Sequence, residues 1–154
     1  MLDWMLMPYR RYAEFSGRSR RKEYWSFVLL FVTVYLICGA VMVAGGYSVT
    51  SLSAPEPQLA EGPSLMFWIG IGLLGVFALA SIVPFVAVVV RRLHDRGLSG
   101  WWFLGVIVIV ASFIPVINLI AGIAILVLMV LPGTPGPNKY GPDPKDPASV
   151  EVFA

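Results

Sequence analysis

Residues 91–102 have the sequence RRLHDRGLSGWW and lie between two long apolar runs. Arginines at the C-terminal end of an apolar helix complement the helix dipole. Gly97 suits the left-handed conformation that ends a helix, and Ser99 is a good N-cap for the helix that follows. Trp101 and Trp102 are of the type found at membrane interfaces. This stretch therefore predicts a junction between two helices at a membrane surface.

The composition of the chain indicates which class of protein it belongs to. The chain has 154 residues, of which 58% are hydrophobic and 13% charged, and its mean hydropathy is +0.80. These values predict an integral membrane protein, an all-α helical bundle forming one domain over residues 1–154. The net charge of +2 comes from short basic clusters beside apolar runs. We expect no nucleic-acid partner, because no fold able to enter a groove fits in such short loops.

Four apolar segments follow from the hydropathy pattern. The first two cover residues 24–45 and 64–90 and carry no charge. As helices they reach about 33 and 40 Å, enough for a hydrocarbon core of about 30 Å. The second is long enough to tilt, and Pro84 is expected to kink it.

The last apolar stretch, residues 100–131, is interrupted between Pro115 and Asn118. It is either one kinked span or a hairpin of two short helices, residues 101–113 and 116–131. We favour the hairpin, with Asn118 capping the turn. Each of its helices is short for a complete span.

The basic residues predict the orientation, because Lys and Arg near span ends stay in the cytoplasm. Residues 1–23 contain six of them, residues 46–63 contain none, and residues 91–100 contain three. We therefore predict a multi-pass protein with a cytoplasmic N-terminus (1–23), an external loop (46–63) and a cytoplasmic loop (91–100). In the hairpin interpretation the tail, 132–154, is also cytoplasmic.

The N-terminal segment is richer in apolar residues than a free tail. A short helix lying in the headgroup plane would gather several of them on one face, although Pro8 opposes it. Those residues are Leu2, Met5, Leu6, Tyr9 and Tyr12.

Three motifs in order resemble the domain-of-unknown-function 805 family, the YhaH-like small bacterial inner-membrane proteins. They are FSGR followed by RKEYW (15–18 and 21–25), RRLHDRGLSGWW (91–102) and PGTPGPNKYGPDP (132–144). The resemblance extends from about Pro8 to Pro144. It implies a bacterial inner-membrane location and four apolar segments, and it brings no established activity.

If all three motifs emerge on the cytoplasmic side, they can pack together. Asp95 and Glu23 then have Arg18, Arg21, Arg91 and Arg92 as available partners, and we predict a compact arrangement of paired charges. The candidate cluster comprises Arg18, Arg21, Glu23, Trp25, Arg91, Arg92, His94, Asp95, Gly97, Ser99, Gly100, Trp101, Asn138, Tyr140, Gly141 and Asp143.

Catalysis and metal binding are disfavoured. His94 is the one histidine, too few for a usual zinc site, and no Ser or Cys lies in a recognisable nucleophile elbow. A general-base role for His94, oriented by Asp95 or Asp143, is the weaker alternative. We therefore predict a protein that is not an enzyme and has no catalytic, cofactor or metal residues.

Transport is the second alternative, as part of an oligomer. The usual sign of a transporter is an ionisable residue within a span, and the apolar segments contain no Asp, Glu, Lys, Arg or His. Gly72, Gly75 and Ala78 form a small-residue seam, which we attribute to packing within the monomer rather than between copies. The oligomeric state stays open.

The favoured function is that of an accessory or scaffold protein. Clusters of Lys and Arg at the inner face attract anionic headgroups. We therefore expect a basic cytoplasmic face that contacts anionic phospholipids or a membrane-protein partner, and no cofactor.

Overall fold

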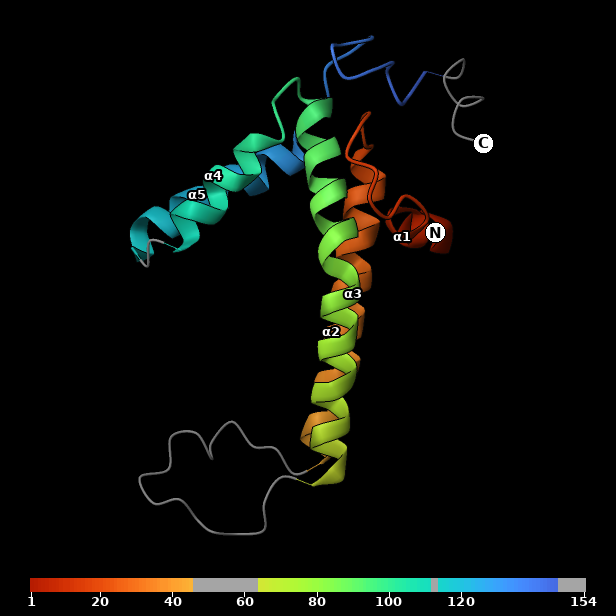
Figure 1. Cartoon of the computed structure of the whole chain (residues 1–154), viewed down its shortest axis with the longest axis vertical. Helices are drawn as coiled ribbons and strands as arrows, with labels where there is room; N and C mark the ends of the chain where they lie inside the picture. The colour runs from red at the N-terminus through yellow and green to blue at the C-terminus, as the bar shows by residue number, and fades with distance from the viewer. Residues whose placement is uncertain (46–63, 112–113, 147–154) are drawn as a thin grey trace. The chain divides into compact units, whose positions relative to one another are not determined.

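The computed structural model describes residues 1–45, 64–111 and 114–146, and in these ranges the chain is helical (Figure 1). The helices are α1 (Leu2–Arg10), α2 (Arg21–Ala44), α3 (Leu65–Asp95), α4 (Trp101–Ala111) and α5 (Pro115–Val130). No strand occurs in those ranges beyond an isolated bridge between Asn138 and Gly141. The all-α prediction is confirmed. The predicted external loop, 46–63, lies outside the described residues.

The chain divides into two compact units. The junction unit comprises Met1–Val28 and Val83–Ala154, and the helix-pair unit comprises Leu29–Ile82. Helices α2 and α3 contribute residues to both. The three polar motifs all belong to the junction unit.

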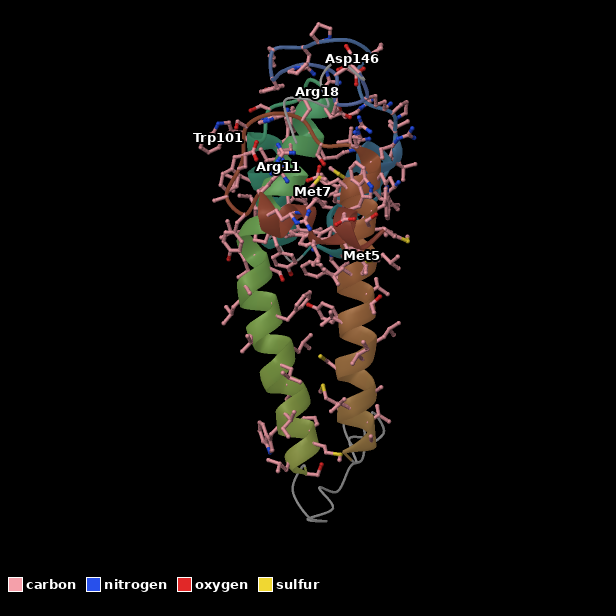
Figure 2. The ribbon with its side chains drawn as sticks, turned by 90° about the vertical axis from the view of Figure 1, so that its right-hand side faces the viewer. Met5, Met7, Arg11, Arg18, Trp101 and Asp146 are labelled. Atoms are coloured by element: carbon pink, nitrogen blue, oxygen red, sulfur yellow. The ribbon has the colours of Figure 1, made fainter. Side chains whose placement is uncertain are left out.

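In the helix-pair unit, α2 and α3 run side by side (Figure 2), and they pack through a glycine and through aromatic side chains. The rings of Phe31 and Phe77 meet edge to face, with centroids 5.0 Å apart. Gly70 lies so close to α2 that an added Cβ would be 2.5 Å from the Met42 side chain. Cys38 is buried, as expected of a small apolar residue.

The small-residue seam does not have the role assigned to it. A Cβ added at Gly72 or Gly75 meets nothing within 4 Å in the described chain. Close packing of α3 on α2 uses Gly70 instead. The prediction of packing within the monomer is therefore wrong at those two glycines, because they lie on a different face of α3.

Two of the helices are long and apolar enough to cross a membrane. Helix α2 has 24 residues and α3 has 31, each containing a window of mean hydropathy 2.7. Helix α3 continues through Pro84. Helices α4 and α5, with 11 and 16 residues, reach only about 16 and 24 Å.

Residues 100–131 form two separate helices that lie side by side (Figure 1), as the hairpin interpretation requires and the single kinked span does not. Asn118 is not the N-cap of α5. The N-cap of α5 is Ile114, without a side-chain capping bond, because Pro115 starts the helix and Asn118 lies within it.

The end of α3 follows the local rules. The Leu98 amide donates to the Leu93 carbonyl at 3.0 Å, and the Gly97 amide donates to that of His94 at 2.9 Å. With φ of 73° at Gly97, this is a Schellman motif, which only glycine adopts without strain. The predicted glycine C-cap is confirmed. Leu98 then packs on a small core formed with Val89 and Met129.

The predicted N-terminal helix is present as α1, and Pro8 lies inside it, near its end. Tyr9 packs edge to face on Phe27 of α2, with centroids 5.3 Å apart. Leu2 and Leu6 remain exposed.

Candidate functional site

Asp95 is the centre of the first half of a buried ion-pair cluster. The Arg18 guanidinium lies 2.9 Å from Oδ1 of Asp95, and Arg92 donates to Oδ2 from one turn earlier on α3. Arg18, Arg92 and Asp95 are 3%, 0% and 3% exposed. One carboxylate thus pairs with two arginines that water barely reaches.

Glu23 is the centre of the second half. Arg91 donates to its Oε1 at 2.7 Å, and the Ser19 hydroxyl donates to its Oε2 at 2.8 Å. Arg91 also donates to the Glu14 carbonyl at 2.7 Å, while its own carbonyl accepts the Ser19 amide at 3.2 Å. The Ser19 hydroxyl thus completes the hydrogen bonding of a buried carboxylate.

Backbone carbonyls of the tail, residues 132–146, complete the coordination of Arg18. Its two terminal nitrogens donate to the Gly136 carbonyl at 2.6 Å and the Thr134 carbonyl at 2.5 Å. A buried charge is tolerated only when its hydrogen-bonding groups are satisfied. The tail therefore supplies hydrogen-bond acceptors that a buried charge of this unit requires.

Three arginines hold the C-terminal end of α5, whose last carbonyls have no partner within the helix. Arg92 donates to the Leu131 carbonyl, Arg21 to that of Val130 at 3.3 Å, and Arg96 to that of Pro132. Cations are favourable at this end of a helix dipole. The motif at 91–102 thus secures both the tail and the last helix.

The tail also bonds directly to the end of α3. The Thr134 amide donates to the Asp95 carbonyl at 2.8 Å, and Nδ2 of Asn138 donates to the His94 carbonyl at 3.0 Å. Gly133 lies against the Asp95 carboxylate, where an added Cβ would be 1.9 Å from Oδ2. Only glycine fits there.

Asp143 stabilises the tail through hydrogen bonds within the tail. Its carboxylate accepts the Gly136 amide at 3.1 Å and the Lys145 amide at 3.0 Å. These bonds hold the pKa of Asp143 below its usual value. Asn138 and Gly141 form the isolated bridge, and Oδ1 of Asn138 accepts the Tyr140 amide at 2.9 Å.

His94 is a contact residue of the tail. Its ring stacks on Tyr140, with centroids 3.9 Å apart and planes 5° from parallel. Its Nδ1 lies 3.2 Å from the Gly17 carbonyl, which can only accept, so the neutral ring carries its proton on Nδ1. Burial lowers the pKa of His94. The carboxylates of Asp95 and Asp143 bond elsewhere, so the geometry of a catalytic pair is not found.

The remaining candidate residues lie apart from the cluster. Arg21 and Trp25 are exposed on α2, and Trp101 is 76% exposed at the periphery, whereas Arg11 and Arg18 lie among crowded side chains (Figure 2). Ser99 accepts the Trp101 amide at 3.4 Å, and Gly100 is in close contact with Val90.

Sequence reasoning missed Ser19, Gly133, Thr134 and Gly136. Gly133, Thr134 and Gly136 act through a backbone group or an absent side chain, which leaves little signal in a single sequence, whereas Ser19 acts through its hydroxyl. The concentration of Gly and Pro between 132 and 142 was the available signal.

A basic outer face accompanies the buried cluster. Lys22 and Arg20 lie over the ring of Trp4 on α1, at 5.1 and 5.9 Å from its centroid. Arg20 also donates to the Pro144 carbonyl, whereas the side chains of Arg21 and Lys22 are exposed. We define the basic face as Trp4, Arg20, Arg21 and Lys22.

A cleft of about 510 Å³ opens between the end of α3 and the start of α4. Its walls are mostly apolar, and His94, Ser99 and Tyr140 line its polar part. Among the described residues no group of three or more His, Cys, Asp or Glu side chains is placed to hold a metal ion.

The comparisons with known proteins agree with these motifs. The family model described as "Protein of unknown function (DUF805)" matches residues 12–142. Inner membrane protein YhaH of Escherichia coli K12 is 33% identical, over 94% of this chain and 98% of its own length. Inner membrane protein YhaI of the same strain is 33% identical, over 94% and 97%. No solved structure matches. The family model spans most of the sequence and contains the first two polar motifs and all but the last two residues of the third, so the chain belongs to the DUF805 family; its relatives YhaH and YhaI are inner membrane proteins.

Proposed function

We propose that this protein is a multi-pass accessory protein of the bacterial inner membrane that presents its basic face to anionic headgroups or to a membrane-protein partner in the cytoplasmic leaflet. The observation that carries the proposal is the division of its cations into two sets. Arg18, Arg91 and Arg92 are buried in ion pairs, whereas Arg21 and Lys22 are exposed beside α1. The first set holds the fold. The second is exposed to a partner, with one hydrogen bond from Arg21 to the Val130 carbonyl.

The basic face is suited to a membrane surface. Trp4 places an amphipathic ring beneath two cations, and the neighbouring side chains Leu2 and Leu6 are exposed. Interfacial helices combine apolar residues with Lys and Arg in this way. Each cation near an anionic surface contributes about 1 kcal/mol.

The proposed topology has the N-terminus, residues 91–100 and the tail in the cytoplasm. It is supported by the distribution of Lys and Arg and by the contacts that join all three segments. Segments bonded to one another in this way must share one side of the membrane.

The topology is tested with single cysteines in a Cys38→Ala background. A cysteine placed at Lys145 is expected to react with a membrane-impermeant thiol reagent only after the cells are permeabilised. A cysteine at Ser53, in the predicted external loop, provides the opposite control. Labelling of the Lys145→Cys variant in intact spheroplasts would overturn the cytoplasmic tail.

The function is tested with the double variant Arg21→Gln, Lys22→Gln. Its affinity for anionic lipid is expected to fall about fivefold per charge, from the 1 kcal/mol above. Native mass spectrometry with phosphatidylglycerol measures it, and crosslinking in native membranes identifies a protein partner. The control is Lys145→Gln, an exposed lysine outside the basic face. Unchanged lipid retention together with an unchanged crosslink pattern would contradict the proposal.

Catalysis is not part of the proposal. His94 serves the tail through Tyr140 and Gly17, and its neighbouring carboxylates are committed to arginines and backbone amides. Transport receives no support from the polar side chains of α2 and α3. Thr33 and Ser81 donate to carbonyls of their own helices, at 2.8 and 2.6 Å.

A further inference from the structure

The cleft beside His94 combines features that the proposed function leaves unused. It is lined on its apolar side by Val86, Val90, Phe103 and Leu104, and on its polar side by His94 and Tyr140. Phe15 and Trp101 add aromatic surface. A pocket with apolar walls and a few convergent polar groups is the usual form of a ligand site.

The apolar walls suit a hydrocarbon chain. Val86 and Val90 belong to the last turns of the long apolar helix α3, and Leu104 belongs to α4, which begins with two tryptophans. Aromatic residues of this kind lie at the level of lipid headgroups. A groove that starts at that level and continues along apolar helices has the dimensions and polarity of an acyl chain site.

The polar side specifies a headgroup. Because Nδ1 of His94 is engaged by the Gly17 carbonyl, Nε2 is the ring nitrogen left for a ligand, and in the neutral ring it accepts a hydrogen bond. A hydroxyl group is a suitable donor. Lys139 places its ammonium 4.9 Å from the Tyr140 ring, beside this end of the cleft. That charge favours an anionic headgroup and disfavours a second ammonium.

We infer that the cleft between α3 and α4 binds one phospholipid of the cytoplasmic leaflet, with an acyl chain against Val90 and Leu104 and a hydroxylated, anionic headgroup at His94 and Lys139. Phosphatidylglycerol has this chemistry. The inference rests on the proposed topology, which places residues 91–100 at the cytoplasmic surface. It concerns different residues from the basic face.

The site is located by photocrosslinking. The full-length protein is placed in phosphatidylethanolamine nanodiscs containing a small fraction of phosphatidylglycerol with a diazirine on its acyl chain. Tandem mass spectrometry is expected to find the crosslinks concentrated on cleft residues such as Val90, Phe103 and Leu104. Crosslinks spread evenly over the apolar faces of all helices would overturn the inference, because they indicate only bulk lipid.

A substitution that fills the cleft provides the second test of the lipid site. Leu104→Trp places a larger side chain in the groove and is expected to lower crosslinking there about tenfold. Val108→Trp is the matched control, with the same new side chain one turn further along α4, at a position that is 71% exposed and does not line the cleft. Equal crosslinking in the two variants would overturn the inference. Since both positions lie at the surface, folding is expected to survive.

Headgroup recognition is tested separately by competition with phosphatidylethanolamine. Lys139→Gln and His94→Leu are expected to lower the preference for phosphatidylglycerol severalfold, while Lys145→Gln leaves it unchanged. His94→Gln retains an acceptor and is expected to restore part of the preference that His94→Leu loses. Binding of both lipids with equal affinity by the unmodified protein would overturn the headgroup assignment.

The outcomes separate this inference from the proposed function. Loss of lipid at the cleft in the Leu104→Trp variant, with the Arg21→Gln, Lys22→Gln variant unaffected, supports the cleft and contradicts the basic face. If the Leu104→Trp variant retains the lipid at the cleft and the Arg21→Gln, Lys22→Gln variant loses affinity, only the assignment of a lipid site to the cleft is contradicted. Labelling of the Lys145→Cys variant from outside would overturn the assignment to the cytoplasmic leaflet, whatever the crosslinks show.

Discussion

The carboxylate of Asp95 holds two buried arginines, from sequence positions 77 and 3 residues away. Neither guanidinium has an exposed surface through which water can replace the pairing. Removing one member of a buried ion pair is far costlier than losing a surface pair, because the remaining charge stays desolvated. Asp95 is therefore the residue on which the junction unit depends most.

We predict that Asp95→Asn lowers the free energy of unfolding by about 3–5 kcal/mol, since it leaves Arg18 and Arg92 without a counter-charge. Thermal or denaturant unfolding in detergent micelles measures the loss. Asp3→Asn is the control, because its pair with Arg10 is largely exposed and contributes less than about 1 kcal/mol. Similar losses in the two variants would contradict the central role of Asp95.

Gly133 is the second residue at which we predict that a substitution lowers stability. Gly133→Ala forces the tail away from Asp95, because the new methyl group would overlap the carboxylate. We expect a loss of stability of about 1–3 kcal/mol, typical of overpacking. In Gly122→Ala, on α5, the methyl meets nothing within 4 Å, and stability should be retained. Equal effects of the two substitutions would refute the close contact, and the same unfolding assay measures both.

At the scale of elements, the junction between α3 and α4 was predictable and its connections to the tail were less so. Gly97 ends α3 by a local rule that a single sequence displays. The pairing of Arg18 with Asp95 depends on packing between distant segments, and the sequence offered four arginines for two carboxylates. Arg21 is excluded by helix geometry, because it lies two residues, about 200°, from Glu23 around α2.

The tail packs against a titratable side chain, the imidazole of His94 on α3. Its pKa is lowered by burial, so protonation opposes the folded arrangement. The associated stability is complete above the unfolded value of 6.5 and is lost as the pH falls from there through the lower folded pKa. We therefore expect the amides of residues 133–141 to exchange faster as the pH falls from 7.5 to 5.5, after correction for intrinsic exchange rates.

Hydrogen exchange followed by mass spectrometry measures this change. His94→Gln should remove most of the pH dependence in that range, because it removes the titratable imidazole. An imidazole titration followed by NMR checks the cause directly. A midpoint above 6.5 would show that protonation strengthens the contact, against this expectation.

At the scale of the whole molecule, composition was enough to predict an all-α membrane protein, because apolar runs without charges have few alternatives. The hairpin at residues 100–131 was favoured because Pro115 and Asn118 interrupt the apolar stretch and because the lysines of the tail favour a cytoplasmic C-terminus. Packing of the tail against the other two motifs was predicted, but the part played by the carbonyls of Thr134 and Gly136 could not be. Backbone acceptors are the same at every position and leave no mark on residue identity.

The tail is expected to be required for the protein to accumulate. Ending the chain after Leu131 removes the carbonyls of Thr134 and Gly136 that accept from Arg18, and it exposes Asp95. Immunoblotting of membranes should show a several-fold lower level than for the full chain. A chain ending after Asp146 retains every tail contact described above and should accumulate normally. Equal levels of the two truncated chains would contradict this requirement.

Arg18 leaves the ribosome more than a hundred residues before the two carbonyls that satisfy it. Until those carbonyls are synthesised, the Arg18 guanidinium has the Asp95 carboxylate but lacks two of its acceptors. The contact therefore distinguishes a finished polypeptide from an interrupted one, and a membrane protease that recognises loosely held termini would act on the interrupted chain first.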